Sequence, residues 1–296
     1  MHPVRIENDQ LSIEVWPHIG GKISSIFDKA DQHELLFTYP AEIPEEPNYD
    51  TSYADHWCSG WDECFPAIAP SVYPRHPYQG ISVPDHGELW GIPTNTAVPT
   101  KNGITCVWNG LRFGYRLARK LYLDGPSVIA EYTLNNLAPF QFRYVWSAHA
   151  LLSLVTPVEL VYEPAGEFRL SHDAEDTDIN APFRWPTGPS SENFAHPDML
   201  PARKGWKMFS ESPISAPMTV HYPKRNRSLR IEYSSEDGMS AYWGIWINTG
   251  GWAGNRHFAL EPTTGRYDQI DRSIKDNSAG SIDPFGQRHW TVKMTV

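Results

Sequence analysis

The residue with the clearest capacity for acid–base chemistry is Glu261, which follows a short apolar run near the C-terminal end of the sequence. Period-two alternation predicts a strand in which Phe258 and Leu260 face one side while Ala259 and Glu261 face the other. Pro262 has no N–H to offer a neighbouring strand, so regular pairing is expected to end there. A carboxylate at such a strand end could serve as a general base, and it could equally be a solvated charge.

Two histidines could supply the complementary acid. His149 falls in the middle of a predicted strand, 142–154, whose one face is apolar and whose other face is more polar. His86 lies in the stretch Pro84–Gly91, which is rich in turn-forming residues. Side-chain pKa values of about 4.3 for Glu and about 6.5 for His would let such a pair divide the base and acid roles. Each histidine also has a structural interpretation, within a sheet or in a surface turn.

Acidic and aromatic residues near these positions suit a polar ligand. Asp62 and Glu63 are adjacent acids in an otherwise apolar setting, where a carboxylate could also bond loop N–H groups. The chain holds 12 Trp, and an indole face can pack against the C–H face of a sugar ring. Trp90 and Trp246 are the candidates for that contact.

The ligand types of a two-histidine-one-carboxylate metal site are also available. His86, His149 and Glu261 could form one, although no spacing in the sequence requires a metal. Gly250–Asn255 lacks the lysine of a phosphate-binding loop. The sequence also lacks a Gly-x-Ser-x-Gly nucleophile motif.

The elements that must position these residues are predicted to be strands. Short alternating runs separated by turn residues, and 26 Pro with no long helical periodicity, indicate an all-β sandwich or barrel. Two loop-rich zones, 38–100 and 165–217, interrupt the pattern. We expect a single domain, 1–296, because no linker or composition break divides the chain. The predicted strands are 4–7, 11–15, 20–28, 105–108, 112–117, 120–123, 128–134, 142–154, 218–222, 229–233, 241–247, 258–261 and 290–294.

Charge and composition limit the partners. The formal net charge is −10 and no stretch concentrates Lys and Arg, which argues against nucleic acid and against an anionic membrane surface. Three cysteines, Cys58, Cys64 and Cys106, do not form a disulfide framework or a zinc-ligand spacing. The first residues lack the apolar run of a signal peptide, and no window resembles a membrane span, so we expect a cytoplasmic protein.

Four stretches together resemble the aldose 1-epimerase (galactose mutarotase-like) superfamily, in the family's order. These are Gly20–Ile23, Asp85–Gly87, the region from Arg119 to His149, and Ala259–Pro262. The resemblance is to a mutarotase-related branch with Trp-Asp-Glu and Asp-His-Gly-Glu motifs. It implies a large antiparallel β-supersandwich.

The resemblance also implies roles for the site residues. Glu261 would be the general base that takes the proton of the anomeric hydroxyl, and His149 the general acid at the ring oxygen. His86 would orient the sugar, and no cofactor is implied. Where many relatives have His-Gly-Phe-Ala-Arg, the chain continues from His86 as Gly-Glu-Leu-Trp, so the arginine that binds a phosphate is absent. Asp62 and Glu63 stand where galactose-type enzymes have an arginine-containing motif, and we expect them to bind an unphosphorylated monosaccharide.

Two other functions fit the same residues. One is a carbohydrate-binding protein of the same fold without turnover, and the other is a metal-dependent, cupin-like enzyme. The sequence leaves the oligomeric state open between monomer and homodimer.

Overall fold

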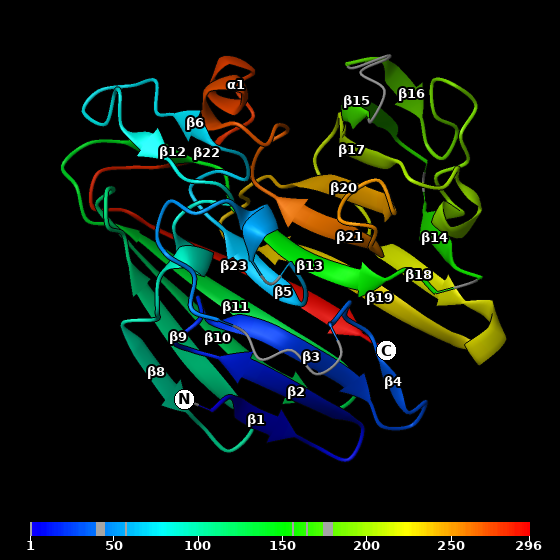
Figure 1. Cartoon of the computed structure of the whole chain (residues 1–296). Coiled ribbons are helices and arrows are strands. Elements are labelled where there is room, and N and C mark those ends of the chain that lie inside the picture. The colour runs from blue at the N-terminus through cyan, green and yellow to red at the C-terminus, as the bar shows by residue number, and fades with distance from the viewer. Residues whose placement is uncertain (1, 40–44, 57, 156, 164, 174–179) are drawn as a thin grey trace.

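Two large antiparallel sheets make up most of the protein. In the computed structural model, described residues are 2–39, 45–56, 58–155, 157–163, 165–173 and 180–296. The sheets pack face to face, with the only α-helix of the described residues, α1 (Ile270–Lys275), at one end beside the short β6 and β12 segments (Figure 1). This arrangement confirms the all-β sandwich predicted from the alternating runs.

The first sheet has eleven strands in the order β1-β2-β3-β5-β13-β21-β20-β17-β15-β16, with β4 paired to β3. Its central strands come from distant parts of the chain. Their bounds are β1 Val4–Glu7, β2 Leu11–Trp16, β3 Lys22–Asp28, β4 His33–Glu34, β5 Trp61–Cys64, β13 Ser147–Ser153, β15 Glu167–Asp173, β16 Pro182–Arg184, β17 Gly205–Ser210, β20 Tyr242–Thr249 and β21 Arg256–Thr263.

The second sheet has eight strands in the order β14-β18-β19-β23-β11-β10-β9-β8. Their bounds are β8 Thr96–Pro99, β9 Gly103–Asn109, β10 Tyr115–Asp124, β11 Ser127–Asn136, β14 Glu159–Tyr162, β18 Met218–Tyr222, β19 Arg227–Ser235 and β23 Gln287–Thr295. Two small sheets pair β12 (Phe142–Tyr144) with β22 (Gly280–Ile282), and β6 (Ser71–Val72) with β7 (Ser82–Val83). Short 3-10 turns are η1 Tyr53–Asp55, η2 Leu89–Gly91, η3 Pro197–Met199 and η4 Pro223–Arg225.

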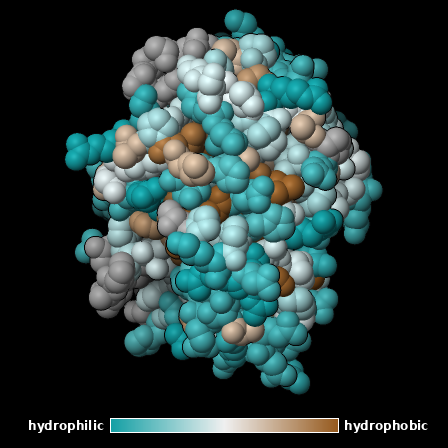
Figure 2. All heavy atoms as spheres, turned by 90° about the vertical axis from the view of Figure 1, so that its right-hand side faces the viewer, coloured by the Kyte–Doolittle hydropathy of each residue, from teal (hydrophilic) through white to brown (hydrophobic). Residues whose placement is uncertain are grey.

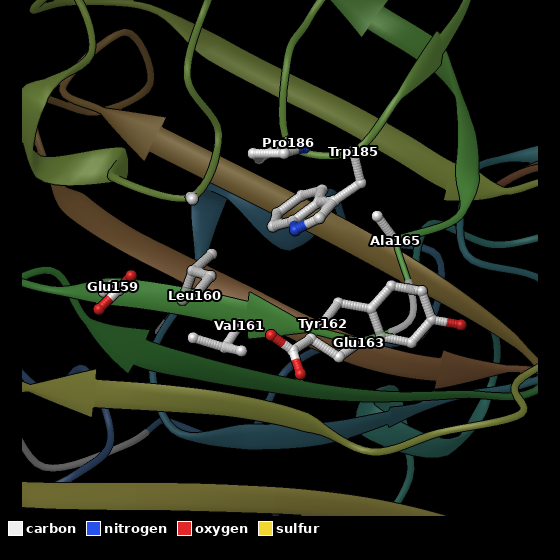
Figure 3. Close-up of a pocket in the computed structure, with 9 residues that line it drawn as sticks. Glu159, Leu160, Val161, Tyr162, Glu163, Ala165, Trp185 and Pro186 are labelled. Atoms are coloured by element: carbon white, nitrogen blue, oxygen red, sulfur yellow. The ribbon is translucent and has the colours of Figure 1, made fainter.

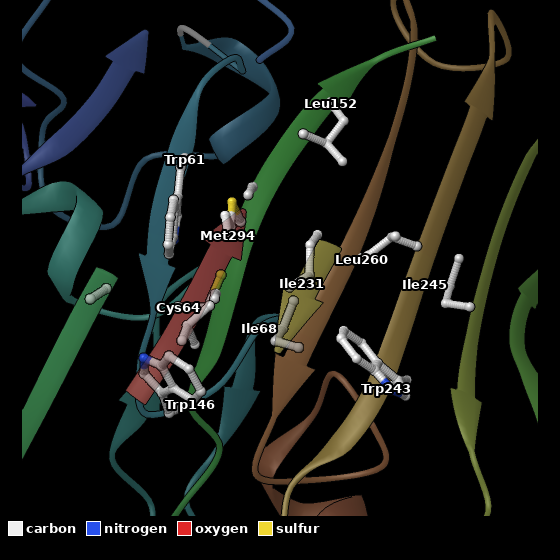
Figure 4. Packing of buried hydrophobic residues seen from close by; sticks show 14 of the residues in the cluster. Trp61, Cys64, Ile68, Trp146, Leu152, Ile231, Trp243, Ile245, Leu260 and Met294 are labelled. Atoms are coloured by element: carbon white, nitrogen blue, oxygen red, sulfur yellow. The ribbon is translucent and has the colours of Figure 1, made fainter. Parts of the chain in front are cut away.

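The hydrophobic core lies between the two sheets. On β10, buried and more exposed residues alternate strictly, so one face packs inward and the other meets solvent. Leu260 of the first sheet and Trp146, which directly precedes β13, lie opposite Ile231 and Met294 of the second sheet (Figure 4). The Trp146 ring also contacts Trp290 of β23, with centroids 5.0 Å apart. Aromatic contacts of this kind bury large areas and fix the two sheets together.

Several predicted elements differ from the structure. The loop-rich zone 165–217 also contains three strands that were not predicted, β15, β16 and β17. The predicted strands 112–117 and 120–123 form one strand, β10, and 142–154 is divided into β12 and β13. A short strand contains too few alternating residues to be distinguished from a loop by its sequence. The errors therefore fall at edge strands and at the breaks between strands.

The predicted strand end at Pro262 is also wrong. β21 continues to Thr263, and Pro262 pairs with Trp243 of β20. On the other side, pairing with β13 is found at Ser147–Thr263 and resumes at Leu151–Ala259. The missing N–H of Pro262 lies within that interruption, so the proline is tolerated inside a central strand.

One face of the molecule is mostly polar (Figure 2). The face in Figure 2 is largely hydrophilic, with hydrophobic side chains in small scattered groups. In the described part of the chain, no helix has both the length and the apolar character needed to cross a membrane.

Candidate active site

The two residues expected to do chemistry face each other on neighbouring strands. The pairings Ser147–Thr263 and Leu151–Ala259 set the register of β13 and β21, and that register places His149 opposite Glu261. Opposite residues on antiparallel strands project from the same face. The His149 Nε2 atom lies 4.0 Å from Glu261 Oε1. Both side chains point away from the core, as the period-two alternation predicted.

Glu261 is fully buried and is held by two neighbours. The ammonium of Lys207, on β17, donates to both carboxylate oxygens, each at 2.7 Å. Ser147 Oγ donates to Glu261 Oε2 at 3.0 Å. Burial disfavours the charged form of Lys207, but the negative charges of Glu261 and Asp268 outweigh it and raise the pKa of Lys207. The carboxylate is therefore paired with a permanently charged lysine.

His149 is neutral at neutral pH. Burial and the positive charges around it, with His86 and Lys207 foremost, hold the pKa of His149 well below its usual value. Its Nδ1 atom has no hydrogen-bond partner among the described residues. A neutral imidazole with an unpaired nitrogen, beside a buried carboxylate, is suited to exchange a proton with a ligand rather than to form a fixed ion pair.

His86 is held in an unusual backbone conformation at the edge of the site. Its φ is 56° and that of Gly87 is 76°, a left-handed pair that favours glycine. A Cβ on Gly87 would lie 2.1 Å from the carbonyl oxygen of Phe65, so only glycine fits there. His86 Nδ1 lies 2.8 Å from Asp85 Oδ1, and its ring stacks on Tyr53 with centroids 3.9 Å apart. The His86 and His149 rings are 5.0 Å apart.

A cavity of about 660 Å³ opens over these side chains. Its volume falls in the range of small-ligand sites. Arg203 and Asp268 add charge to its wall, and Trp246 adds an aromatic surface. The remaining lining residues are Ile68, Ala69, Asp85, His86, His149, Ser171, His172, Gly205, Lys207, Gly251, Trp252 and Gln269.

The predicted ligand-contact residues lie in different places. Trp246 lines the cavity, and its indole N–H donates to His257 Nε2 at 3.1 Å. Trp90 is buried outside the lining, where its indole N–H donates to the carbonyl of Asp85 at 2.6 Å. Asp62 lies opposite His149 in the β5–β13 strand pairing, but its side chain is buried and does not line the cavity.

Asp62 binds protein groups rather than facing the cavity. It accepts from the Tyr53 hydroxyl at 2.9 Å and from the ammonium of Lys22, while its Oδ1 has no partner among the described residues. Tyr53 in turn stacks on His86, so Asp62 and His86 contact the same aromatic side chain.

Glu63 lies on the opposite face of β5 and does not reach the cavity. It is fully buried, and it accepts from Arg119 at 3.0 Å, Tyr132 at 2.7 Å and Trp146 at 2.9 Å. Adjacent strand residues face opposite sides, so Asp62 and Glu63 could not both face one ligand. The expected substrate contact of Glu63 is corrected to a core ion pair between the sheets.

Lys207 and Asp268 are charged residues of the site that the sequence does not predict, as is Arg203. Lys207 lies in the zone 165–217, where no strand is predicted, although Trp206 and Met208 flank it as core residues would flank an outward-facing lysine. Asp268 lies between β21 and α1, with its Oδ1 3.8 Å from Lys207 Nζ. Burial and the negative charge of Glu261 raise the pKa of Asp268. The positive charge of Lys207 offsets part of this rise. Neither residue belongs to a recognisable sequence motif.

A second hollow of about 690 Å³ runs along β14 (Figure 3). Tyr162 and Trp185 lie on its walls, and the carboxylates of Glu159 and Glu163 are nearby. None of the described residues that line it is a histidine or a lysine, so these residues do not form an acid–base pair of the kind found in the first cavity.

The donor set suggested for a metal was also tested. Among the described residues, no group of three or more His, Cys, Asp or Glu side chains is arranged to hold a metal ion. His149 and Glu261 are near each other. The Glu261 carboxylate, however, already accepts hydrogen bonds from the Lys207 ammonium, and His86 bonds Asp85.

The geometry was compared with known proteins. No family model and no curated protein matches the sequence. Solved structures do match over nearly the whole chain. A protein of Synechocystis sp. PCC 6803 has a TM-score of 0.74 and 14% identity, covering 99% of this chain and 94% of its own.

Two further structures carry descriptive names. A galactose mutarotase-like protein of Lactobacillus casei ATCC 334 has a TM-score of 0.72 and 15% identity, covering 99% of each chain. A galactose mutarotase related enzyme of Lactobacillus acidophilus has a TM-score of 0.71 and 13% identity, covering 99% of this chain and 96% of that one. The chain therefore has the galactose mutarotase-like fold, as the sequence motifs indicated.

Proposed function

We propose that the protein is an aldose 1-epimerase-like isomerase that interconverts the anomers of an unphosphorylated monosaccharide. The observation that carries this proposal is the opposition of His149 and Glu261, with Nε2 and Oε1 4.0 Å apart, beneath a cavity of about 660 Å³. Ring opening needs a group that accepts a proton and a group that donates one, both within reach of one sugar. The galactose mutarotase-like fold of the chain supports the same assignment.

The reaction uses the two side chains on two oxygens of the sugar. Glu261 takes the proton of the anomeric hydroxyl while His149 gives a proton to the ring oxygen, and the bond between C1 and the ring oxygen breaks. Rotation about C1–C2 then exposes the other face of the aldehyde, and closure runs with the roles reversed. No step requires a cofactor.

The walls of the cavity supply sugar recognition. Trp246 offers an aromatic face, and His86 offers the nitrogen that does not bond Asp85. The Gly87-Glu88-Leu89-Trp90 sequence after His86 lacks a phosphate-binding arginine, and Glu88 is buried against Tyr49 and Tyr115. The substrate class that fits is therefore a neutral, hydroxyl-rich ring.

Anomer interconversion on a panel of aldoses tests the proposal. NMR exchange measurements should show a rate above spontaneous mutarotation for at least one sugar. Glu261→Gln and His149→Asn should each abolish that excess rate, whereas the exposed matched controls Glu236→Gln and His76→Asn should retain it. Sugar binding without an excess rate would replace the enzyme by a carbohydrate-binding protein. Loss of activity with a chelator, restored by a divalent ion, would instead establish a metal-dependent enzyme.

A further inference from the structure

The carboxylate proposed as the base does not itself face the cavity. Glu261 is fully buried and is absent from the cavity lining, whereas Lys207 and His149 are part of that lining. Both oxygens of Glu261 bond the Lys207 ammonium. A sugar that enters the cavity therefore meets the Lys207 ammonium before it meets Glu261.

Lys207 has a donor to spare. An ammonium carries three N–H donors. Two are used on Glu261 Oε1 and Oε2, each at 2.7 Å. Asp268 Oδ1 lies 3.8 Å away, which is beyond hydrogen-bond distance, and no other acceptor is found among the described residues. The third donor is available to an oxygen that enters the cavity beside Asp268.

We propose that Lys207 is a further catalytic residue, which binds the anomeric oxygen of the sugar and delivers its hydroxyl to Glu261. This inference rests on the proposed anomer interconversion. The anomeric oxygen accepts the third N–H of Lys207, and the hydrogen of its hydroxyl points to an oxygen of Glu261. The charged side chains of Lys207 and Glu261 then contact the same hydroxyl group of the substrate.

The proton and electron balance of ring opening follows from this placement. The O1–H proton passes to Glu261, and the O1 electrons form the C1=O1 bond. The electron pair of the bond between C1 and the ring oxygen stays on the ring oxygen, which takes a proton from His149. Lys207 keeps its three protons throughout. It stabilises the negative charge that builds on O1 as the proton leaves, in the manner of an oxyanion-stabilising donor.

A second buried pair on the same sheet shows what a purely structural arrangement looks like. Lys22 bonds Asp62 and the carbonyl oxygen of Ser59, the latter at 2.7 Å, and both side chains are almost fully buried. Neither residue lines the cavity. Lys22 therefore provides a control for the cost of breaking a buried lysine–carboxylate pair without a substrate contact.

Lys207→Met tests the proposal, with Lys22→Met as the buried control and Lys101→Met as the exposed control. Removing one stabilising donor is expected to lower kcat about 100-fold or more. The loss should appear in kcat more than in KM, because Lys207 stabilises the charge that builds on O1 as the proton leaves. Lys22→Met should keep the kcat of the folded fraction, and Lys101→Met should change neither kcat nor stability.

Other outcomes have defined meanings. Lys207→Met with an unchanged kcat overturns the role of Lys207. If that variant does not fold, Lys207→Arg decides the question. Arg keeps the charge but presents a rigid planar fork, so a loss of kcat supports the role and an unchanged kcat overturns it. If the wild-type protein itself shows no excess rate on any aldose, the proposed function has failed, and the result is distinct from a failure of Lys207 alone.

Discussion

The ring of Tyr53 lies on the ring of His86, with centroids 3.9 Å apart and planes 17° from parallel, while its hydroxyl donates to Asp62 at 2.9 Å. One aromatic side chain thus connects a buried acid of the sheet to a histidine of the cavity wall. The contact also restrains a histidine that is held at a positive φ. The position of His86 therefore depends on Tyr53 as well as on its own loop.

Two substitutions of Tyr53 should separate these contributions. Tyr53→Phe keeps the stack and removes the hydrogen bond to Asp62, so it should lower the free energy of unfolding by about 1–3 kcal/mol. KM and kcat should stay within about threefold of the wild-type values, because His86 and Asp62 both keep their positions. Tyr53→Ala removes the stack and should raise KM tenfold or more, since His86 loses its support. Denaturant unfolding and steady-state kinetics measure the two effects, and equal KM values in both variants would contradict the role of the stack.

Glu63 should matter for stability rather than for sugar binding. Glu63→Gln leaves Arg119 as a buried charge without a carboxylate partner, which typically costs about 3–5 kcal/mol. The fraction of protein that remains folded should have unchanged KM, because Glu63 faces the core. Denaturant unfolding with activity corrected for the folded fraction checks both statements. A raised KM at full folding would restore Glu63 to the ligand site.

The alternating strand pattern predicted the all-β fold and the direction in which the Glu261 side chain points. Phe258 and Leu260 alternate with Ala259 and Glu261, and the structure keeps that alternation, because burial of the apolar face fixes which way each side chain points. The same rule, applied to Asp62 and Glu63, would have separated the two acids. The strand Trp61–Cys64 is too short for its pattern to mark it as a strand, so the sequence does not show that the two acids face opposite sides.

Residues that enter the site from weakly patterned segments were not predictable. Lys207 reaches Glu261 only because β17 pairs with β20 beside β21, and a pairing between strands far apart in sequence leaves no local signal. Trp90 was grouped with Trp246 by residue type alone. Its burial depends on the turn at Leu89–Gly91 and on the hydrogen bond to Asp85, which the composition of the loop does not reveal.

The low pKa of His149 predicts a specific dependence of rate on pH. Above that pKa only a small fraction of His149 is protonated, and the fraction falls about tenfold for each unit of pH. If His149 is the acid, kcat/KM corrected for spontaneous mutarotation should fall about tenfold per unit between pH 6 and 8. His149→Asn should show no excess rate at any pH in this range. A corrected rate that stays constant over this range would instead fit His149 as the base, because a base with such a low pKa is already deprotonated there.

Trp246 and Trp90 should respond differently to the same substitution. Trp246 lines the cavity, so Trp246→Phe reduces the surface available to a sugar ring and should raise KM about fivefold or more with kcat little changed. The pKa of His257 is lowered to about 4 by burial, so His257 stays neutral in this variant even though it loses the indole donor. Trp90→Phe removes the bond to Asp85, so its effect should appear in stability instead.

Fluorescence gives the measurement for this pair. Titration with the active sugar should change the tryptophan emission of the wild-type protein, because Trp246 lies in the cavity wall and Trp252 contacts it with ring centroids 6.0 Å apart. Trp246→Phe should lose most of that change, while Trp90→Phe should keep it. If Trp246→Phe keeps the full signal and the wild-type KM, the sugar binds elsewhere in the cavity, and its contacts shift toward His172 and Arg203 on the wall.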